Sequence, residues 1–428
     1  MKRTFVYFIC MVAALGGLLF GYDWVVIGGA KPFYEAYFGI ADSASDQGLA
    51  MTTALIGCML GAMVCGSLAD RLGRRKLLMV AATVFILSAY ATGAADGFGA
   101  FLVARLFGGV GIGLASGLSP MYIAEVAPAD IRGRMVSLNQ MMIVLGILAA
   151  QVINWLIADP MPAGITTEAI AQSWNGQSGW RWMFWMPVFP AAAFLILAFF
   201  IPESPRWIAM RAAGTKQADP SSGPGLRQLF SRQYARLLGL GLFIAVFQQW
   251  CGTNVIFNYA QEVFHSAGYE IGDVLFNIVV TGIANVIFTV IAIYTVDRLG
   301  RKPLMLIGAG GLSMIYAVLG CCYFLHVTGV GMILLVVAAI ACYAMTLGPV
   351  TWVLISEIFP DRIRGVAVAT CTFALWVGSS TLTYTFPFLN RALGSYGTFW
   401  IYSAVCAVGF VFFKYGLRET KGQDLGKA

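Results

Sequence analysis

The stretch Asp70-Arg71-Leu72-Gly73-Arg74-Arg75-Lys76 follows one apolar segment of the chain, and a near copy, Asp297-Arg298-Leu299-Gly300-Arg301-Lys302, follows another. A second pair of motifs has the same relation: Glu125-x-x-Pro128-x-x-Ile131-Arg132-Gly133 recurs as Glu357-x-x-Pro360-x-x-Ile363-Arg364-Gly365. Two matches at nearly the same offset indicate that the chain consists of two related halves. Internal repeats of this kind are typical of transporter folds, in which the substrate site lies near the middle of the membrane between the halves.

The composition predicts an all-α integral membrane protein. Of the 428 residues, 59% are hydrophobic and only 11% are charged, whereas a soluble domain carries about 25% charged residues. No polar stretch is long enough for a soluble catalytic domain, so we do not expect an enzyme. A helix needs about 20 apolar residues to cross a bilayer. We place twelve such spans at 5–29, 48–69, 77–95, 100–122, 135–158, 182–201, 237–262, 274–296, 303–325, 330–355, 366–388 and 397–416.

The distribution of basic residues predicts the orientation of these spans. With the N-terminus inside, the cytoplasmic segments hold all but four of the 27 lysines and arginines, as the positive-inside rule requires. The exceptions are Lys31, Arg181 and Arg391 on the outside and Arg105 within the fourth span. We therefore expect both termini in the cytoplasm. The expected domains are a six-helix bundle over 1–201, a cytoplasmic linker over 202–236, a second six-helix bundle over 237–416 and a short tail over 417–428.

Several other functions lack support in the sequence. The net charge of +7 is spread over short loops between apolar spans, which argues against nucleic acid as a partner. The nine cysteines fall in apolar spans without the Cys/His spacing of a metal site. The glycine-rich segment 108–113 lacks a nucleotide-binding spacing, and the chain has no Walker motif. Small residues in a membrane span more often allow helices to pack closely. We expect no nucleotide and no cofactor.

Asp23 lies well within the first span, in the stretch Leu18-Leu19-Phe20-Gly21-Tyr22-Asp23-Trp24. A carboxylate at membrane depth costs roughly 2.5–3.5 kcal/mol on insertion scales, so it needs a partner and a use. Arg105 is the candidate partner, because it is the one basic residue placed inside a span. A conformational change that alters their separation or hydration would change the proton affinity of Asp23. The alternative is a fixed structural ion pair, which also satisfies two buried charges.

Span 7 contains a cluster of amide side chains. Gln248, Gln249 and Asn254 each offer a donor and an acceptor for hydroxyl groups. Gly252 and this polar cluster predict a local break in the helix, a device that transporter sites often use. The alternative is that the amides only bond helices together.

With these motifs the chain resembles the sugar porter family of the major facilitator superfamily, in particular its bacterial proton–sugar symporters of the xylose–proton type. The resemblance extends from about Leu15 to the last span. The motifs that carry it, besides the two repeated pairs, are Arg105-x-x-x-Gly109, Pro202-Glu203-Ser204-Pro205-Arg206-Trp207, Gln248-Gln249-x-x-Gly252-x-Asn254 and Gly348-Pro349-x-x-Trp352.

The resemblance implies two bundles that alternate access to a central monosaccharide. It pairs an Asp in span 1 with an Arg in span 4 for proton coupling, which corresponds to Asp23 and Arg105. It also implies a cytoplasmic network of charges that acts as a gate, composed of Arg74, Glu125, Arg132, Glu203, Arg206, Arg301, Glu357 and Arg364.

The same resemblance completes the expected sugar site. Gln140 in span 5 matches the family's sugar-binding glutamine. Trp352 is expected to stack on the sugar ring, and Phe20 and Trp376 are candidates for the apolar wall. The family often has a sugar-binding asparagine where this chain has Ser379, whose shorter hydroxyl leaves room or a water.

We therefore expect a monomeric, multi-pass protein of the inner (plasma) membrane that imports a monosaccharide by proton symport. Its partners are the sugar and the lipid bilayer. Two alternatives remain, a facilitative sugar uniporter and a sugar sensor that does not transport. Sensors of this type usually carry a long cytoplasmic tail, which disfavours the second. The sequence does not distinguish a hexose from a pentose or a polyol.

Overall fold

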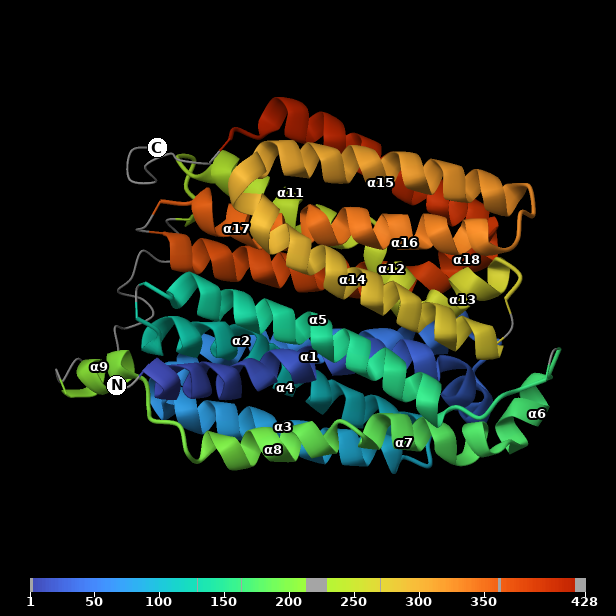
Figure 1. The fold of residues 1–428 in the computed structure, drawn as a ribbon, viewed down its shortest axis with the longest axis horizontal. Coiled ribbons are helices and arrows are strands. Elements are labelled where there is room, and N and C mark those ends of the chain that lie inside the picture. Colours follow the sequence, from blue (N-terminus) through green and yellow to red (C-terminus); the bar gives the residue numbers. More distant parts are fainter. Residues whose placement is uncertain are drawn as a thin grey trace. The chain divides into compact units, whose positions relative to one another are not determined.

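The computed structural model describes residues 3–128, 130–162, 164–212, 229–269, 271–360 and 363–419, apart from the side chains of residues 271, 272, 293, 296–298, 356, 364 and 365. This part of the chain is helical and contains no strand (Figure 1). The prediction of an all-α fold is confirmed. Contacts divide the chain into two compact units, the first formed by residues 1–217 and 270–282 and the second by residues 218–269 and 283–428.

The helices of the first half fall in the order that the sequence predicts. They are α1 (Arg3–Phe38), α2 (Ala44–Leu72), α3 (Arg74–Gly93), α4 (Phe98–Val126), α5 (Arg132–Ile157), α6 (Thr167–Gln172), the π-helix η1 (Asn175–Gly179), α7 (Trp180–Trp185), α8 (Val188–Ala198) and α9 (Pro205–Ala212). The helices of the second half are α11 (Ala235–Trp250), α12 (Thr253–Asn258), α13 (Ala260–Ser266), α14 (Ile271–Leu299), α15 (Arg301–Phe324), α16 (Val330–Met345), α17 (Leu347–Glu357) and α18 (Arg364–Gly416).

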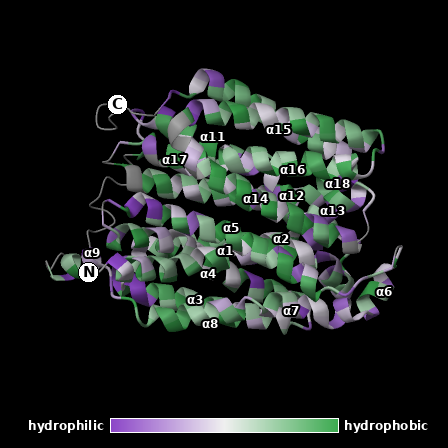
Figure 2. Cartoon of the chain, in the orientation of Figure 1, coloured by the Kyte–Doolittle hydropathy of each residue, from purple (hydrophilic) through white to green (hydrophobic). Residues whose placement is uncertain are grey.

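Eleven helical segments in the described residues are long and apolar enough to cross a membrane. Figure 2 shows hydrophobic residues along most of their length and hydrophilic residues mainly toward their ends. The last segment, 51 residues long, is interrupted at Gly394, whose φ of 66° and ψ of 174° are not helical. The interruption falls in the gap that the sequence predicts between spans 11 and 12.

The two repeated motifs have the same backbone conformation. Gly73 separates α2 from α3 with φ 93° and ψ 157°, and Gly300 separates α14 from α15 with φ 89° and ψ 162°. Only glycine adopts such angles readily, because it has no Cβ. The shared geometry shows that the two motifs are structural counterparts, and it places Arg74 and Arg301 at the first position of the helix that follows.

Glycines allow the close packing of α2 against α4 that segment 108–113 suggests. A Cβ on Gly109 would lie 1.9 Å from the carbonyl oxygen of Ala54, and one on Gly57 would lie 2.1 Å from that of Leu106. Helices in lipid associate largely through such close contact of small residues. The packing fixes α4, and with it Arg105, against the rest of the first unit.

Two predicted spans differ from the observed helices. The first helix continues to Phe38 rather than ending at residue 29, so Lys31 lies inside it and not in an outer loop. Lys31 is buried and pairs with Glu35 one turn later, at 2.9 Å. The sixth predicted span begins at residue 182, but the helical segment there begins at Asn175. The expectation that Arg105 is the one basic residue within a span was therefore wrong.

Candidate functional site

Asp23 and Arg105 form a buried ion pair within the first unit. The Oδ1 atom of Asp23 on α1 lies 2.8 Å from Nη1 of Arg105 on α4, and their side chains are 10% and 3% exposed. The guanidinium carbon of Arg105 also lies 5.4 Å from the centre of the Phe184 ring. The structure thus brings together the two residues that the sequence predicts to be partners.

The pair is not saturated with hydrogen bonds. Among the described residues, Oδ2 of Asp23 and Nε of Arg105 have no hydrogen-bond partner.

Other predicted sugar contacts in the first unit lie on α1 and α5. Phe20 packs edge to face against Trp24, with 5.7 Å between the ring centres, and both are half-buried. Gln140 on α5 is also half-buried.

In the second unit, three amide side chains form a continuous chain of hydrogen bonds. Asn254 donates to Gln249, Gln249 donates to Gln248, and Gln248 donates to the hydroxyl of Tyr343 at 2.6 Å. All three amides are buried. The amides predicted from the sequence are therefore assembled into one network, and Tyr343 on α16 extends it. Tyr343 carried no motif and was missed.

The amide network depends on the break that Gly252 introduces. Gly252 separates α11 from α12 in a left-handed conformation, with φ 89° and ψ −13°. A Cβ there would also lie 2.9 Å from the ring of Tyr402. The break lets Asn254 reach Gln249 although they lie on different helices, and it confirms the predicted interruption of span 7.

A second break, which the sequence analysis did not predict, divides span 10. Thr346 lies between α16 and α17 with φ −126° and ψ −87°. Pro349 is the available signal, because a proline has no N–H to donate to the carbonyl of Met345 four residues earlier.

The remaining predicted sugar contacts differ in exposure. Trp352 on α17 is 41% exposed, whereas Trp376 on α18 is 3% exposed and Ser379 is fully buried. The hydroxyl of Ser379 has no hydrogen-bond partner among the described residues. The exposed indole of Trp352 offers a flat surface, while the other two residues are enclosed.

A charged cluster lies at the start of α3 in the first unit. Arg74 donates from Nε and Nη2 to the two carboxylate oxygens of Glu125, at 3.1 and 3.2 Å. Glu203 accepts from the backbone N–H of Arg74 at 2.8 Å and from that of Arg75 at 3.1 Å. Ser204 donates to Glu125 as well. A carboxylate at the N-terminus of a helix satisfies backbone donors that the helix leaves unpaired.

The second unit repeats this cluster at the start of α15. Arg301 pairs with Glu357 at 3.2 Å, as Arg74 pairs with Glu125. Glu419 accepts from the backbone N–H of Arg301 at 2.9 Å and from that of Lys302 at 3.0 Å. Glu203 accepts from the corresponding backbone groups in the first unit. The sequence places Glu419 in the short tail over 417–428, and its part in this cluster was not predicted. Its position directly after the last span, like Glu203 after span 6, was the signal.

Three predicted gate residues are not part of these clusters. Arg132 and Arg206 are exposed and form no ion pair with any residue that the structure describes. The side chain of Arg364 lies outside the described residues. The clusters therefore contain Arg74, Glu125 and Glu203 in one unit and Arg301, Glu357 and Glu419 in the other.

These observations define a polytopic membrane protein built from two repeated helical units, with a buried ion pair in one and a buried amide network in the other. A family model described as "Sugar (and other) transporter" matches residues 9–222 and residues 213–428. The chain therefore belongs to this family of sugar transporters, as its resemblance to the sugar porters predicts.

Relatives of known name support the assignment. The chain is 35% identical to the D-xylose-proton symporter of Escherichia coli strain K12, over 99% of this chain and 95% of that protein. It is 33% identical to the arabinose-proton symporter of Bacillus subtilis, over 98% and 94%. It is 32% identical to the glucose facilitated diffusion protein of Zymomonas mobilis, over 97% and 95%.

The fold is similar to that of solved sugar transporters. The inward-open conformation of the xylose transporter XylE from E. coli matches 98% of both chains with a TM-score of 0.84 and 34% identity. A structure of the same proton:xylose symporter bound to 6-bromo-6-deoxy-D-glucose matches with a TM-score of 0.78 and 34% identity.

Proposed function

We propose that this protein imports a monosaccharide together with a proton, by alternating access between two six-helix bundles. The observation that carries the proposal is the buried pair of Asp23 and Arg105, which leaves one carboxylate oxygen unbonded within the described residues. A simple facilitator has no need of a buried carboxylate, which is costly at membrane depth. Two of the relatives above are named as proton symporters of pentoses, so a pentose or a hexose is the expected substrate.

The proposal includes the topology and the setting of the protein. We count the helices before and after the break at Gly394 as two separate crossings, so the proposed number of spans is twelve. An even number places both termini on one side, and the excess of basic residues in the loops makes that side cytoplasmic. We propose a monomer in the inner membrane of the cell, with the proton as its coupling ion and no other cofactor.

We propose sugar contacts in each of the two units. Gln248, Gln249 and Asn254 supply donors and acceptors, and Gln140 adds another amide. A buried hydroxyl without a partner costs about 1–3 kcal/mol, so an amide network selects a ligand rich in hydroxyl groups. The flat contacts proposed for the sugar ring are Phe20, Trp352 and Trp376, and Ser379 takes the place of the family's asparagine.

Sugar uptake in proteoliposomes tests this function. With an imposed proton gradient, acidic outside, we expect labelled sugar to accumulate above its external concentration, and we expect a protonophore to abolish the accumulation. The rival function is facilitated diffusion, as the name of the Zymomonas relative describes for that protein. Uptake that only equilibrates, with or without the gradient, would support the rival and contradict proton symport.

We also propose that the two charged clusters, with Arg132, Arg206 and Arg364, form a cytoplasmic gate that stabilises the inward-closed state. Arg74→Gln removes both bonds to Glu125, so it is expected to shift the protein toward the inward-open state. In intact cells the apparent affinity for external sugar should fall about tenfold, while purified protein in detergent still binds sugar. Arg71→Gln is the matched control, because Arg71 is an exposed neighbour of the same charge. If Arg74→Gln lowers only the melting temperature, the cluster is structural and not a gate.

A further inference from the structure

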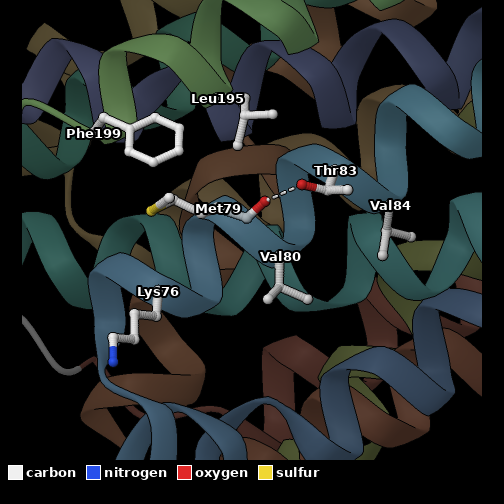
Figure 3. A pocket seen from close by; sticks show the side chains of 7 residues that line it. All are labelled: Lys76, Met79, Val80, Thr83, Val84, Leu195 and Phe199. Carbon is white, nitrogen blue, oxygen red and sulfur yellow. Dashed lines mark hydrogen bonds between the residues drawn. The ribbon is translucent and has the colours of Figure 1, made fainter.

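A groove runs along the outer surface of the first unit between α3 and α8. Its apolar part has a volume of about 400 Å³ and is lined by Met79, Val80 and Val84 from α3, by Leu195 from α8 and by Phe199 directly after α8 (Figure 3). It begins near the first turn of α3 and extends toward the middle of that helix. None of the residues that line it belongs to the ion pair or to the amide network, and the proposed transport mechanism does not use it.

The groove has a polar end. A second hollow of about 370 Å³ shares Lys76, Met79 and Phe199 with the first and adds Arg75, Glu203 and Trp207. The two hollows therefore form one continuous surface that is charged at one end and apolar at the other. Tryptophan is enriched at the level of lipid headgroups, so the position of Trp207 fits the membrane interface.

The polar side chain that lines the apolar part already has a hydrogen-bond partner, so it needs no water. Its hydroxyl group, that of Thr83, donates to the carbonyl of Met79 at 2.9 Å within the same helix (Figure 3). Val80 and Phe199 are exposed at the surface of the unit. Their side chains are therefore available to a hydrocarbon chain from the bilayer.

The polar end of the groove carries a positive charge that has no counter-charge within the described part of the chain. Glu203 is occupied by backbone N–H groups, and the guanidinium of Arg75 donates to the carbonyls of Ala198 and Phe199 at 3.2 and 2.6 Å. Lys76 is exposed and forms no ion pair within the described part of the chain. Its ammonium group is thus free to meet an external anion.

The repeat indicates that Lys76 is not required by the cluster. In the second unit the first two basic positions are kept as Arg301 and Lys302, but the position of Lys76 is taken by Pro303. Lys302 donates to the carbonyl of Lys414 at 3.0 Å, as Arg75 donates to the end of α8. The extra positive charge therefore belongs to the groove of the first unit alone.

We propose that this groove binds an anionic phospholipid, with the phosphate at Lys76 and one acyl chain along Met79, Val80 and Val84. The polar end supplies a positive charge for the headgroup, and the apolar part supplies a hydrocarbon contact. A free phosphate would contact only the positive charge, whereas a lipid would also contact the apolar part, so the shape of the groove favours a lipid.

Native mass spectrometry of the full chain tests the proposal, with equal amounts of phosphatidylglycerol and phosphatidylcholine added in detergent. The unmodified protein should retain phosphatidylglycerol in preference. Lys76→Gln should reduce the retained phosphatidylglycerol about fivefold, since one basic residue near a lipid surface contributes about 1 kcal/mol. Lys76→Arg should retain it. Val80→Trp, which fills the apolar part and keeps the charge, should reduce it as well.

Lys414→Gln is the matched control, because it removes the same charge from an exposed lysine of the second unit. It should leave lipid retention unchanged. The proposal is overturned if phosphatidylglycerol and phosphatidylcholine are retained equally, or if phosphatidylethanolamine, added in equal amount, is retained in place of phosphatidylglycerol. It is also overturned if Lys76→Gln and Val80→Trp retain as much phosphatidylglycerol as the unmodified protein. Melting temperatures of the variants show whether any loss reflects unfolding.

Discussion

Asp23→Asn is expected to abolish accumulation of sugar against its gradient while sugar exchange across the membrane continues. Asparagine keeps the shape of the side chain and removes the group that binds the proton. The accumulation ratio in proteoliposomes with an imposed proton gradient should fall to unity, and exchange of labelled for unlabelled sugar should persist. Asp42→Asn is the matched control, because Asp42 is an exposed carboxylate in the following loop; it should accumulate sugar normally.

The variant also distinguishes coupling from a fixed structural pair. Asp23→Asn leaves the buried guanidinium of Arg105 without its counter-charge, and breaking a buried pair costs roughly 3–5 kcal/mol. A melting curve is therefore needed beside the transport assay. Asp23→Glu keeps the carboxylate and should restore part of the accumulation. Accumulation that survives in a folded Asp23→Asn protein would show that this carboxylate does not carry the coupled proton.

Gln249→Ala is expected to weaken sugar binding more than other changes in the amide network. Gln249 donates to Gln248 and accepts from Asn254, so its loss removes one hydrogen bond from each of two buried amides. The network then no longer holds the amides in the orientation that sugar hydroxyls require. We expect the dissociation constant to rise roughly ten- to a hundredfold, which corresponds to about 1–3 kcal/mol. Calorimetric titration of purified protein measures it.

The alternative for these amides is that they only bond helices to one another. In that case Gln249→Ala would lower the melting temperature and leave sugar affinity unchanged. Gln177→Ala is a useful control, because Gln177 is an exposed glutamine that bonds the carbonyl of Ala171 far along the chain from span 7. It should change neither quantity appreciably.

Much of the fold follows from the sequence because the membrane restricts backbone conformation. A segment in lipid must satisfy its own backbone groups, so a long apolar run becomes a helix. Special residues then predict the interruptions: Gly252 predicts the break in span 7, and the glycines of the two repeated motifs separate paired helices. Asp23 and Arg105 could be paired before the structure, since a charge at membrane depth requires a compensating one.

The features that were not predicted are of two kinds. Some depend on a charge that a neighbouring residue neutralises, and others depend on a partner that is distant in the sequence. Lys31 seemed to end the first span, but Glu35 neutralises it one turn later and the helix continues. Tyr343 belongs to the amide network because α16 brings its hydroxyl to within 2.6 Å of Gln248 on α11, almost a hundred residues earlier in the sequence. No pattern within a single segment contains that information.

The hydrogen bonds of Glu419 to the start of α15 affect where a label can be attached to this protein. Its carboxylate binds the backbone of Arg301 and Lys302, more than a hundred residues earlier in the sequence. A fluorescent reporter or affinity tag joined directly after the last span would displace this carboxylate and loosen the second unit. Reporters should therefore begin well beyond Glu419, and a loss of activity in a tagged protein should first be checked at this junction.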